Sequence, residues 1–478
     1  MNSVLVKARP HAVCLPFPGQ GHINPMLKIA RLLFWKGFTL TFVNTGYIHQ
    51  RLVQSRGPTN LGGLPAFRFE TIPEGIPENA IETMHIVPAL CLSPAKSCLA
   101  QFQSLLTRVN STREVPSVSC ILSDGVISYT LDANEELGQN AVLFWTATAC
   151  GFMAYVHTWR LIKRGIVPFK DNSSLTYADT RIDWLSGNKE VGLKDIPSFI
   201  RATRTEDIML NFAVGERCRS KPEAAIILNC FESLEHDVIK ATRSVAFAGV
   251  YSIGPLCVPE AEDNIAESLA RTGANPWKED TECLDWLDTK APPNAVVKLQ
   301  ASLTVMTNHQ LVEFAWGLAS TRKEFLWLAH PDLVSADSTG LPNDFINRTA
   351  NRAMLGTWCP QERVLAHPAL GVYVTHSGWN STLESVTGGV PMVCWPFFGD
   401  QTTNCRYACT EWGIGMEIDA DVRREEVGEV MRELMGGEKG KEMKRRAVEW
   451  KESAFRATEP GGKSSLHIER LLKEVMLK

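Results

Sequence analysis

The chain alternates short apolar runs with amphipathic segments along most of its length. His11–Pro18 and Phe38–Thr45 are apolar or β-branched runs of the length expected for buried strands, and Met26–Trp35 between them places its apolar residues at helical spacing. The same alternation resumes in the second half, where Ala295–Leu299 and Glu324–Ala329 flank another helical pattern. This order of elements predicts an α/β protein built on parallel sheets.

An acidic stretch interrupted by Gly and Pro separates the two alternating halves, and 478 residues exceed what one ordinary core accommodates. We therefore expect two Rossmann-like, doubly wound parallel-sheet domains that face each other across a cleft. The expected division is residues 1–250 for the first domain, 251–293 for the linker, 294–455 for the second domain and 456–478 for a final helix.

The composition is that of an ordinary globular protein, with 44% hydrophobic and 21% charged residues and a net charge of -4. The charge gives no sign of nucleic-acid binding. The 13 cysteines are scattered without a CxxC pair or metal-ligand spacing, which favours a reducing compartment, and Cys394 looks like a small core residue. With neither a signal-peptide pattern nor a run of ~18 apolar residues, we expect a cytoplasmic monomer without a membrane span.

The stretch from Trp358 to Gln401 carries the densest candidate chemistry. Gly371–Thr375 reads as a buried strand, His376–Ser381 as a turn, and the segment from Thr382 as the start of a helix. A helix that starts there directs unpaired backbone N–H groups and the positive end of its dipole at the turn. The sequence therefore predicts a phosphate or diphosphate site, although Ser and Asn at such a place can also simply cap the helix.

Other polar and aromatic residues of this stretch suit the rest of a nucleotide sugar. Glu384, one helical turn further on, can accept hydrogen bonds from a ribose diol, and Trp358 offers a flat face for a base. Asp400 and Gln401 close the stretch with side chains suited to sugar hydroxyls.

Two candidate catalytic residues follow strands in the first half. His22 lies in the glycine-rich turn after the first strand, where the carboxyl ends of parallel strands gather ligands, and a histidine is the usual base near neutral pH. Asp124 follows the strand Ser117–Leu122 and either caps the next helix or accepts the Nδ1–H of His22. The turn lacks the third glycine of GxGxxG, which disfavours a nicotinamide-dependent oxidoreductase.

From about residue 8 to its end, the chain resembles the plant family 1 UDP-sugar glycosyltransferases, most specifically in the stretch from Trp358 to Gln401 and in PFPGQGHINPML around His22. The resemblance implies the GT-B fold, an acceptor-binding first domain, a UDP-sugar-binding second domain and a C-terminal helix that returns to the first domain. It implies inverting transfer of glucose from UDP-glucose, without a metal or other cofactor, to a hydroxyl or carboxyl of a small lipophilic metabolite. The segments RIDWLSGNKEVGLKDIPSFIR and DIMLNF resemble the subfamily that glucosylates terpenoid alcohols, iridoid aglycones and cyanohydrins.

The resemblance also implies roles for individual residues. His22 would be the general base and Asp124 its partner. The implied donor-binding residues are Thr146, Ser302, Trp358, Cys359, Gln361, His376, Gly378, Trp379, Asn380, Ser381, Glu384, Asp400 and Gln401.

One segment departs from the family pattern. Where the family carries a strand close to YVNFGS, this chain has Val297–Ser302, one residue shorter, with Lys298 at a buried position and Ala301 in place of Gly. We expect a displaced or shortened strand, or a lysine that reaches solvent along its stem, and a weakened donor site. The alternative function is therefore a catalytically weak relative that binds a nucleotide sugar or small molecule.

Overall fold

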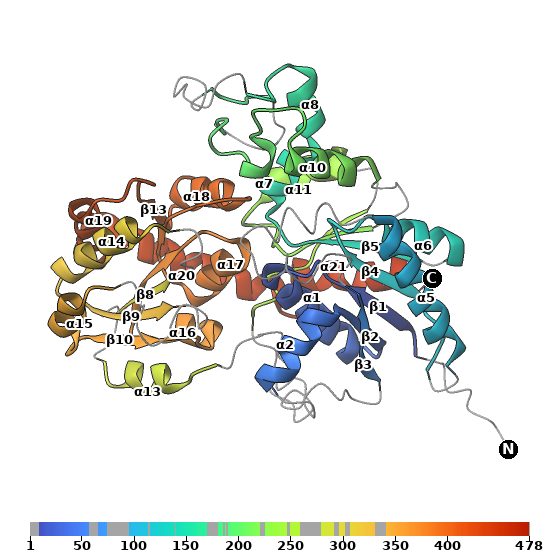
Figure 1. Cartoon of the computed structure of the whole chain (residues 1–478), viewed down its shortest axis with the longest axis horizontal. Coiled ribbons are helices and arrows are strands. Elements are labelled where there is room, and N and C mark those ends of the chain that lie inside the picture. The colour runs from blue at the N-terminus through green and yellow to red at the C-terminus, as the bar shows by residue number, and fades with distance from the viewer. Residues whose placement is uncertain are drawn as a thin grey trace.

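The apolar runs of the first half form one seven-stranded parallel sheet in the computed structural model (Figure 1). Its strand order is β3-β2-β1-β4-β5-β6-β7. The strands are β1 (His11–Leu15), β2 (Thr39–Thr45), β3 (Phe67–Ile72), β4 (Cys120–Asp124), β5 (Asn140–Trp145), β6 (Ala225–Leu228) and β7 (Val250–Ser252). The sheet therefore ends two residues beyond position 250, inside the segment expected to be the linker.

The second half forms a six-stranded parallel sheet in the order β10-β9-β8-β11-β12-β13. Its strands are β8 (Val296–Ala301), β9 (Glu324–Ala329), β10 (Ala353–Gly356), β11 (Leu370–Thr375), β12 (Met392–Cys394) and β13 (Gly415–Glu417). We call the parts of the molecule built on the first and second sheets the N-terminal and the C-terminal lobe. The expected pair of doubly wound parallel-sheet units is confirmed.

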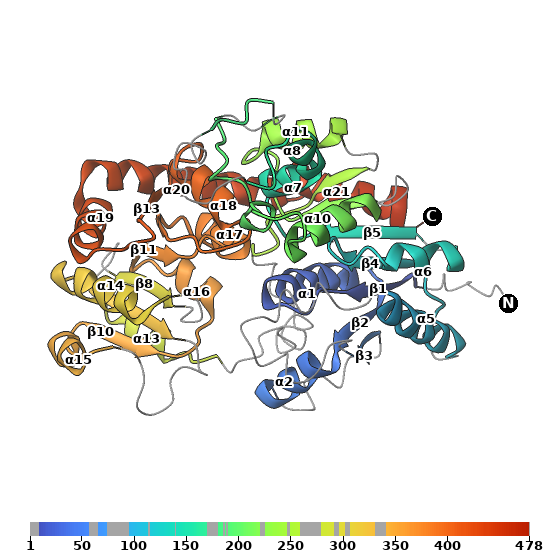
Figure 2. The same cartoon turned by 45° about the horizontal axis from the view of Figure 1, so that its top comes forward.

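The structure describes residues 9–56, 66–73, 95–112, 115–138, 140–169, 180–184, 187, 190–219, 225–245, 249–258, 279–290, 296–301, 306–329 and 341–477. Helices cover both faces of each sheet (Figure 2). Those of the N-terminal lobe are α1 (Gln20–Trp35), α2 (Gly46–Arg56), α5 (Ala95–Ser111), α6 (Thr130–Leu137), α7 (Ala149–Val156), α8 (Thr158–Lys163), η2 (Ser198–Ile200), α10 (Ile208–Arg219) and α11 (His236–Val245). Those that follow are α13 (Glu282–Asp288), α14 (Asn308–Ser320), α15 (Asn343–Thr349), α16 (Gln361–Ala366), α17 (Trp379–Gly388), α18 (Gln401–Cys409), α19 (Arg424–Gly436), α20 (Glu438–Thr458), α21 (Lys463–Leu471) and the π-helical turn η4 (Leu472–Met476).

Two helices begin earlier than the sequence pattern predicts. Helix α1 starts at Gln20 and contains Pro25, and α17 starts at Trp379 rather than at Thr382. The polar residues read as turn residues therefore lie in the first turns of helices. His22 and Asn380 consequently sit among the backbone N–H groups that a helix start leaves unpaired.

The segment that departs from the family pattern forms a regular central strand. Strand β8 pairs with β9 along its whole length and with β11 on the other side, with one register shift between Leu370 and Val372. Lys298 is fully buried, so the expectation that it reaches solvent along its stem is wrong, and the strand spans the six residues Val296–Ala301. Ser302 and the side chain of Ala301 lie outside the described part of the chain.

The two lobes are joined by buried tryptophans of the C-terminal lobe. The Trp379 indole donates to the carbonyl of Asn229 at 2.8 Å, and the Trp412 indole donates to the carbonyl of Leu234 at 3.1 Å. The two rings contact each other with centroids 6.0 Å apart. Since both acceptors follow β6, these bonds fix the second sheet against the end of the first.

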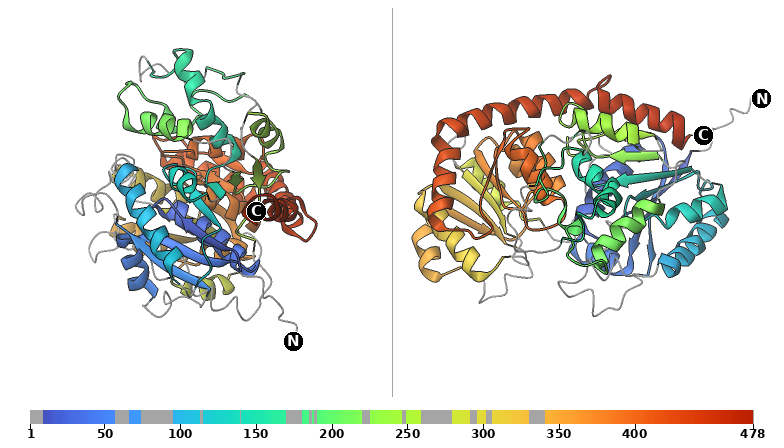
Figure 3. Two further views of the ribbon diagram at one scale, coloured as in Figure 1. Left: turned by 90° about the vertical axis from the view of Figure 1, so that its right-hand side faces the viewer. Right: turned by 90° about the horizontal axis from the view of Figure 1, so that it is seen from above.

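The C-terminal helices run along both lobes. Figure 3 shows α20 and α21 extending from the C-terminal lobe across to the N-terminal sheet. There Ser464 donates to the carbonyl of Gly254 at 2.6 Å, Tyr251 donates to Glu474 at 2.9 Å, and Asn140 donates to the carbonyl of Val475 at 2.8 Å. Among the described residues, no helix is both long and apolar enough to cross a membrane.

Protonation of His467 should weaken this attachment. The ring is nearly buried and its Nδ1 lies 2.9 Å from the carbonyl of Ser252. Burial lowers the pKa of His467, and the cationic Arg243 acts in the same direction while Glu232 opposes it. The unfolded chain therefore takes up this proton first, so the stabilisation present above the unfolded pKa of about 6.5 is lost as the pH falls below it.

We expect the difference in melting temperature between the wild type and His467→Gln to narrow from about pH 7.5 to about pH 5.5. Scanning fluorimetry at these pH values measures it. His236→Gln, at a 56% exposed side chain, is the control. A difference that stays constant with pH would show that His467 is not held neutral.

Candidate functional site

A cleft of about 830 Å³ lies between the lobes, at the carboxyl edges of both sheets. In each sheet the strand order reverses at one point, between β1 and β4 and between β8 and β11, and open parallel sheets bind ligands at such points. Residues that follow β1, β4 and β11 line the cleft. Of the predicted site residues, those that line it are His22, Asp124, Thr146, Trp358, Cys359, Gln361, His376, Gly378, Trp379, Asn380, Ser381, Glu384, Asp400 and Gln401. Ser302 lies outside the described residues.

His22 and Asp124 form a hydrogen-bonded pair on the N-terminal side of the cleft. Nδ1 of His22 lies 2.8 Å from Oδ2 of Asp124 and 3.0 Å from Oγ1 of Thr146, which follows β5. The Asp124 side chain is 1% exposed and that of His22 30%. With the Nδ1 proton directed at the carboxylate, Nε2 is left as the basic nitrogen.

The alternative role of Asp124 as a helix cap does not hold in this structure. Helix α6 begins at Thr130, and Asp124 instead accepts the backbone N–H of Val126 through Oδ1 at 3.1 Å. Gly125 is required here because a Cβ would lie 2.5 Å from the Trp145 indole. The turn therefore holds the carboxylate at the end of β4, facing His22.

The charge of Asp124 controls the protonation of His22. Burial lowers the pKa of His22, but the Asp124 carboxylate raises it by more, with a further contribution from Asp400 across the cleft. The net result is a pKa above the ordinary histidine value. The raised pKa makes His22 a stronger base than an ordinary histidine.

On the other side of the cleft, the turn from β11 into α17 is tightly folded. Ser377 has a positive φ of 62°, and a Cβ on Gly378 would lie 2.5 Å from Nε2 of His376. Glycine therefore allows the His376 ring to lie over the helix start. Burial, assisted by the positive charge of Lys298, lowers the pKa of His376 to about 4, so the ring is a neutral hydrogen-bonding group near pH 7.

Asn380 links the two sides of the cleft. Its side-chain nitrogen donates to the carbonyl of Gly21 at 2.8 Å. In a regular helix that carbonyl would accept the N–H of residue 25, but Pro25 has none. The start of α17 therefore satisfies an acceptor that proline leaves free in the first turn of α1 (Figure 2).

A chain of hydrogen bonds runs from Lys298 to the start of α17. The Lys298 ammonium donates to Oε1 of Gln361 at 2.7 Å and lies 4.4 Å from the centre of the Tyr373 ring. Since an ammonium only donates, this bond fixes the orientation of the Gln361 amide. Its nitrogen then donates to Glu384 at 2.6 Å and lies 3.3 Å from Oγ of Ser381.

Glu384 is a carboxyl group in a largely buried, mixed-charge environment. Burial raises the pKa of Glu384 to about 7, and the positive charge of Lys28 partly offsets this. Lys28, on α1, forms an ion pair with Glu362 on α16 and so connects the lobes at the cleft. Sequence reasoning missed Lys28, because a lysine on an amphipathic helix gives no signal of its partner.

Some predicted donor-site residues use their side chains for packing. Trp379 is 3% exposed, and its indole N–H donates to the Asn229 carbonyl. The Cys359 thiol contacts Cys283. Oε1 of Gln401 accepts the backbone N–H groups of Phe397 and Phe398 at 2.8 and 3.1 Å. These residues therefore shape the wall of the cleft more than they present free polar groups.

Asp400 remains turned towards the cleft. It precedes α18 and accepts a hydrogen bond from Asn404 at 3.2 Å. Burial raises the pKa of Asp400, while the Asn404 hydrogen bond lowers it. Asp400 and His22 both line the cleft, and the charge of Asp400 contributes to the raised pKa of His22.

The end of the cleft near His22 is apolar. Phe17 lies beside the His22 ring with centroids 5.1 Å apart, and Phe199 and Phe398 approach each other from opposite lobes at 6.1 Å. Helix α10 adds Met209 and Phe212 to this wall. Periodicity alone did not identify these aromatic residues, because an apolar wall and a core have the same sequence pattern.

A family model described as UDP-glucoronosyl and UDP-glucosyl transferase matches residues 293–448. UDP-glycosyltransferase 85A5 of Arabidopsis thaliana is 59% identical over 478 residues, covering 100% of this chain and 99% of the relative. (R)-mandelonitrile beta-glucosyltransferase of Prunus dulcis is 52% identical and covers 100% of this chain and 99% of that protein.

Solved structures show the same architecture. A UDP-glucosyltransferase from Polygonum tinctorium, described as capable of glucosylating indoxyl, superimposes with a TM-score of 0.79 at 26% identity, covering 98% of this chain and 99% of that one. The two facing parallel-sheet lobes are therefore the GT-B fold. Since relatives with more than half of their residues identical span the full length, this chain belongs to the plant family 1 UDP-glycosyltransferases and is a glycosyltransferase.

Proposed function

We propose that the protein transfers glucose from UDP-glucose, with inversion, to a hydroxyl of a small lipophilic metabolite. The observation that carries this proposal is the placement of the His22–Asp124 pair opposite the N-terminus of α17 in one cleft. The N-terminal lobe would hold the acceptor and the C-terminal lobe the donor. Relatives named for mandelonitrile and for 7-deoxyloganetin support a cyanohydrin or an iridoid aglycone as the acceptor.

The reaction on this proposal is a single displacement. Nε2 of His22 takes the proton of the acceptor hydroxyl, and the oxygen forms a bond to the anomeric carbon as the bond from that carbon to the diphosphate oxygen breaks. The electron pair leaves with UDP on the opposite face, which inverts the configuration. Asp124 orients the imidazole and stabilises the imidazolium that forms.

Charge on the departing diphosphate would be stabilised by the C-terminal lobe. The α17 N-terminus supplies backbone N–H groups and a positive dipole, and His376 and Ser381 add side-chain donors. Trp358 would stack on uracil and Glu384 would accept the ribose hydroxyls. These groups do the work of charge neutralisation, so the proposed mechanism uses no metal.

The activity is tested by incubating the protein with UDP-glucose and a panel of cyanohydrins, iridoid aglycones and terpenoid alcohols. Release of UDP together with a hexose mass gain on one acceptor supports the proposal. Tight UDP binding without either product would favour the alternative, a binding protein.

Replacing the base or its partner should have different effects on the pH profile. His22→Ala should lower kcat by about 10²–10⁴-fold with UDP affinity nearly unchanged. Asp124→Asn removes the charge that raises the pKa of His22, so the acidic limb of kcat/KM should move to lower pH while the plateau falls. An unmoved acidic limb in Asp124→Asn would contradict the role given to this pair.

Removing donors at the α17 start should weaken UDP and UDP-glucose together. His376→Ala and Ser381→Ala each delete a hydrogen bond to a charged oxygen, worth ~1.5–3 kcal/mol. Trp358→Ala should also weaken both ligands through lost stacking. Calorimetry measures these affinities, with Thr410→Ala at the exposed end of α18 as the control. Unchanged affinities in all three variants would rule out this donor site.

Lys298 should contribute to donor binding through Gln361. Lys298→Met keeps an unbranched side chain in the core but leaves Oε1 of Gln361 with only the longer bond from the Tyr373 hydroxyl, at 3.4 Å, and removes a positive charge near Glu384. We expect UDP affinity to fall about tenfold, equivalent to ~1.4 kcal/mol. The matched control is Lys290→Met, which removes an ion pair with Glu324 in the same lobe. Equal UDP affinities in the wild type and in Lys298→Met would show that Gln361 keeps its orientation without the bond from Lys298.

A further inference from the structure

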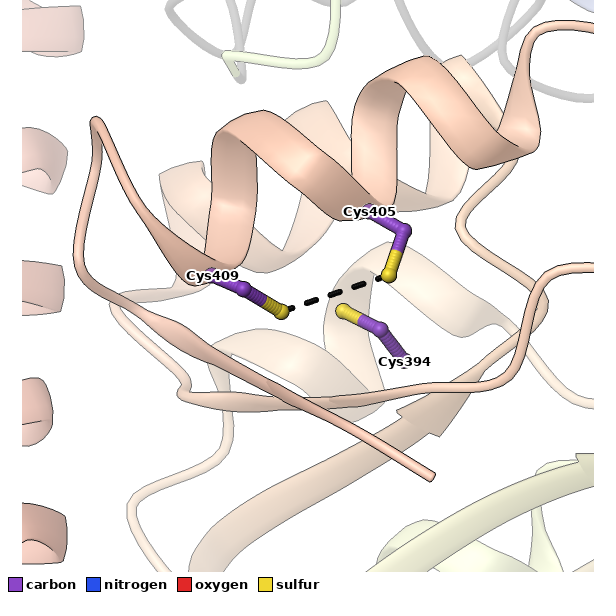
Figure 4. Close-up of side chains that lie close together, drawn as sticks. All are labelled: Cys394, Cys405 and Cys409. Carbon is purple, nitrogen blue, oxygen red and sulfur yellow. Dashed lines mark hydrogen bonds between the residues drawn. The ribbon is translucent and has the colours of Figure 1, made fainter. Parts of the chain in front are cut away.

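Three cysteine thiols converge behind the α17 turn. Cys394 ends β12, and Cys405 and Cys409 lie one turn apart on α18. The three sulfur atoms all lie within 4.8 Å of one another, and those of Cys405 and Cys409 are 4.0 Å apart. Figure 4 shows the thiols pointing towards a common centre. Cysteines can act simply as small apolar core residues, but core packing does not require three sulfurs to meet at one point.

The spacing of the sulfurs is close to that of a thiolate metal site. With a zinc–sulfur distance of ~2.3 Å, the sulfurs of a tetrahedral site lie ~3.8 Å apart. The 4.0 Å between Cys405 and Cys409 needs only a small side-chain adjustment. The spacing of the cysteines did not indicate this set, because no CxxC pair or other metal-ligand spacing occurs.

Oxygen atoms flank the thiols. Glu417 on β13 is the register partner of Cys394, so both side chains project to the same face of the sheet, and its carboxylate accepts a hydrogen bond from Cys405. Ser377 lies beside the Cys394 thiol, and its buried hydroxyl has no partner with good hydrogen-bond geometry. A Cβ on Gly415 would lie 3.1 Å from Sγ of Cys394, so glycine leaves room there.

We propose that Cys394, Cys405 and Cys409 form a binding site for a thiophilic d¹⁰ metal ion of the zinc and cadmium class, with Glu417 as the fourth ligand. Binding displaces the three thiol protons to solvent as three metal–sulfur bonds form. Cys409 is partly exposed and Glu417 is exposed, which gives the ion a path from the surface.

The site is connected to the donor side of the cleft. Asn404, next to Cys405, donates to the carbonyl of Ser377 at 2.9 Å and to Asp400. An ion bound to the thiols would therefore tie the start of α18 to the turn that carries His376. Metal binding does not depend on the proposed transfer reaction, so the two can fail separately.

The test is a titration of the reduced, metal-free full-length protein with Cd²⁺. We expect near-ultraviolet thiolate-to-cadmium charge transfer that saturates at one equivalent, the loss of three reactive thiols, a higher melting temperature, and displacement of Cd²⁺ by Zn²⁺. Cys405→Ser and Cys409→Ala should each weaken Cd²⁺ binding by about tenfold or more. Cys98→Ser, at a buried cysteine on α5, should bind Cd²⁺ as the wild type does.

Two results would overturn the proposal. One is a wild-type protein that shows no thiolate-to-cadmium band saturating at one equivalent of Cd²⁺, or a band that is the same in Cys405→Ser and Cys409→Ala as in the wild type. The other is a disulfide between Cys405 and Cys409 in freshly purified protein, seen as a mass lower by two hydrogen atoms, which would make the pair a redox couple instead. Folding of each variant is checked by circular dichroism, and Cys409→Ala, at the partly exposed position, keeps the test informative if Cys405→Ser fails to fold.

Discussion

The Gly21 carbonyl, left without a helical donor by Pro25, is the point on which the arrangement of the cleft depends. It accepts its hydrogen bond from Asn380 in the opposite lobe, so the first turns of α1 and α17 meet directly. A helix start leaves backbone N–H groups without helical acceptors, and the starts of α1 and α17 both line the cleft. His22, the proposed general base, therefore lies at one helix start, the proposed anion-binding groups lie at the other, and the Asn380–Gly21 hydrogen bond joins the two directly.

Two buried tryptophans also hold the two lobes in this arrangement. Trp379 is the first residue of α17, and its indole bond to Asn229 anchors the helix start from behind. The indole of Trp412, which follows α18, donates in the same way to the carbonyl of Leu234. The polar side of the turn from β11 into α17 can therefore face a ligand, because the apolar side of the same turn packs against the N-terminal lobe. Trp379 therefore has a structural role within the stretch from Trp358 to Gln401 although its side chain is buried.

Elements with strong periodicity could be predicted from the sequence, and elements defined by few residues could not. Strands such as β2 and β9, and the helix α14, lie where their apolar patterns place them, whereas β12 and β13 have three residues each and no periodicity to detect. The sequence pattern does not predict the early starts of α1 and α17, because Gly and Pro are typical turn residues. Pro25 is tolerated inside α1 because the Gly21 carbonyl, which proline cannot pair, accepts a hydrogen bond from Asn380 in the other lobe. The cleft residues and the pairing of His22 with Asp124 followed from the resemblance, but other contacts did not, because no spacing relates Lys298 to Gln361 or Cys394 to Cys405.

Lys298, which departs from the family pattern, is stabilised by its neighbours inside the C-terminal lobe. An ammonium in a central strand is costly unless its donors are used, and here they meet the Gln361 amide and the face of Tyr373. Burial, with a further contribution from the charge of Lys298, lowers the pKa of His376, and the same charge opposes the protonation of Glu384 that burial favours. A nucleoside diphosphate would bring negative charge to the same region. On the proposed function, that negative charge would add to the interactions with Gln361 and Tyr373 that already stabilise the Lys298 ammonium, at a strand position where an apolar side chain was expected.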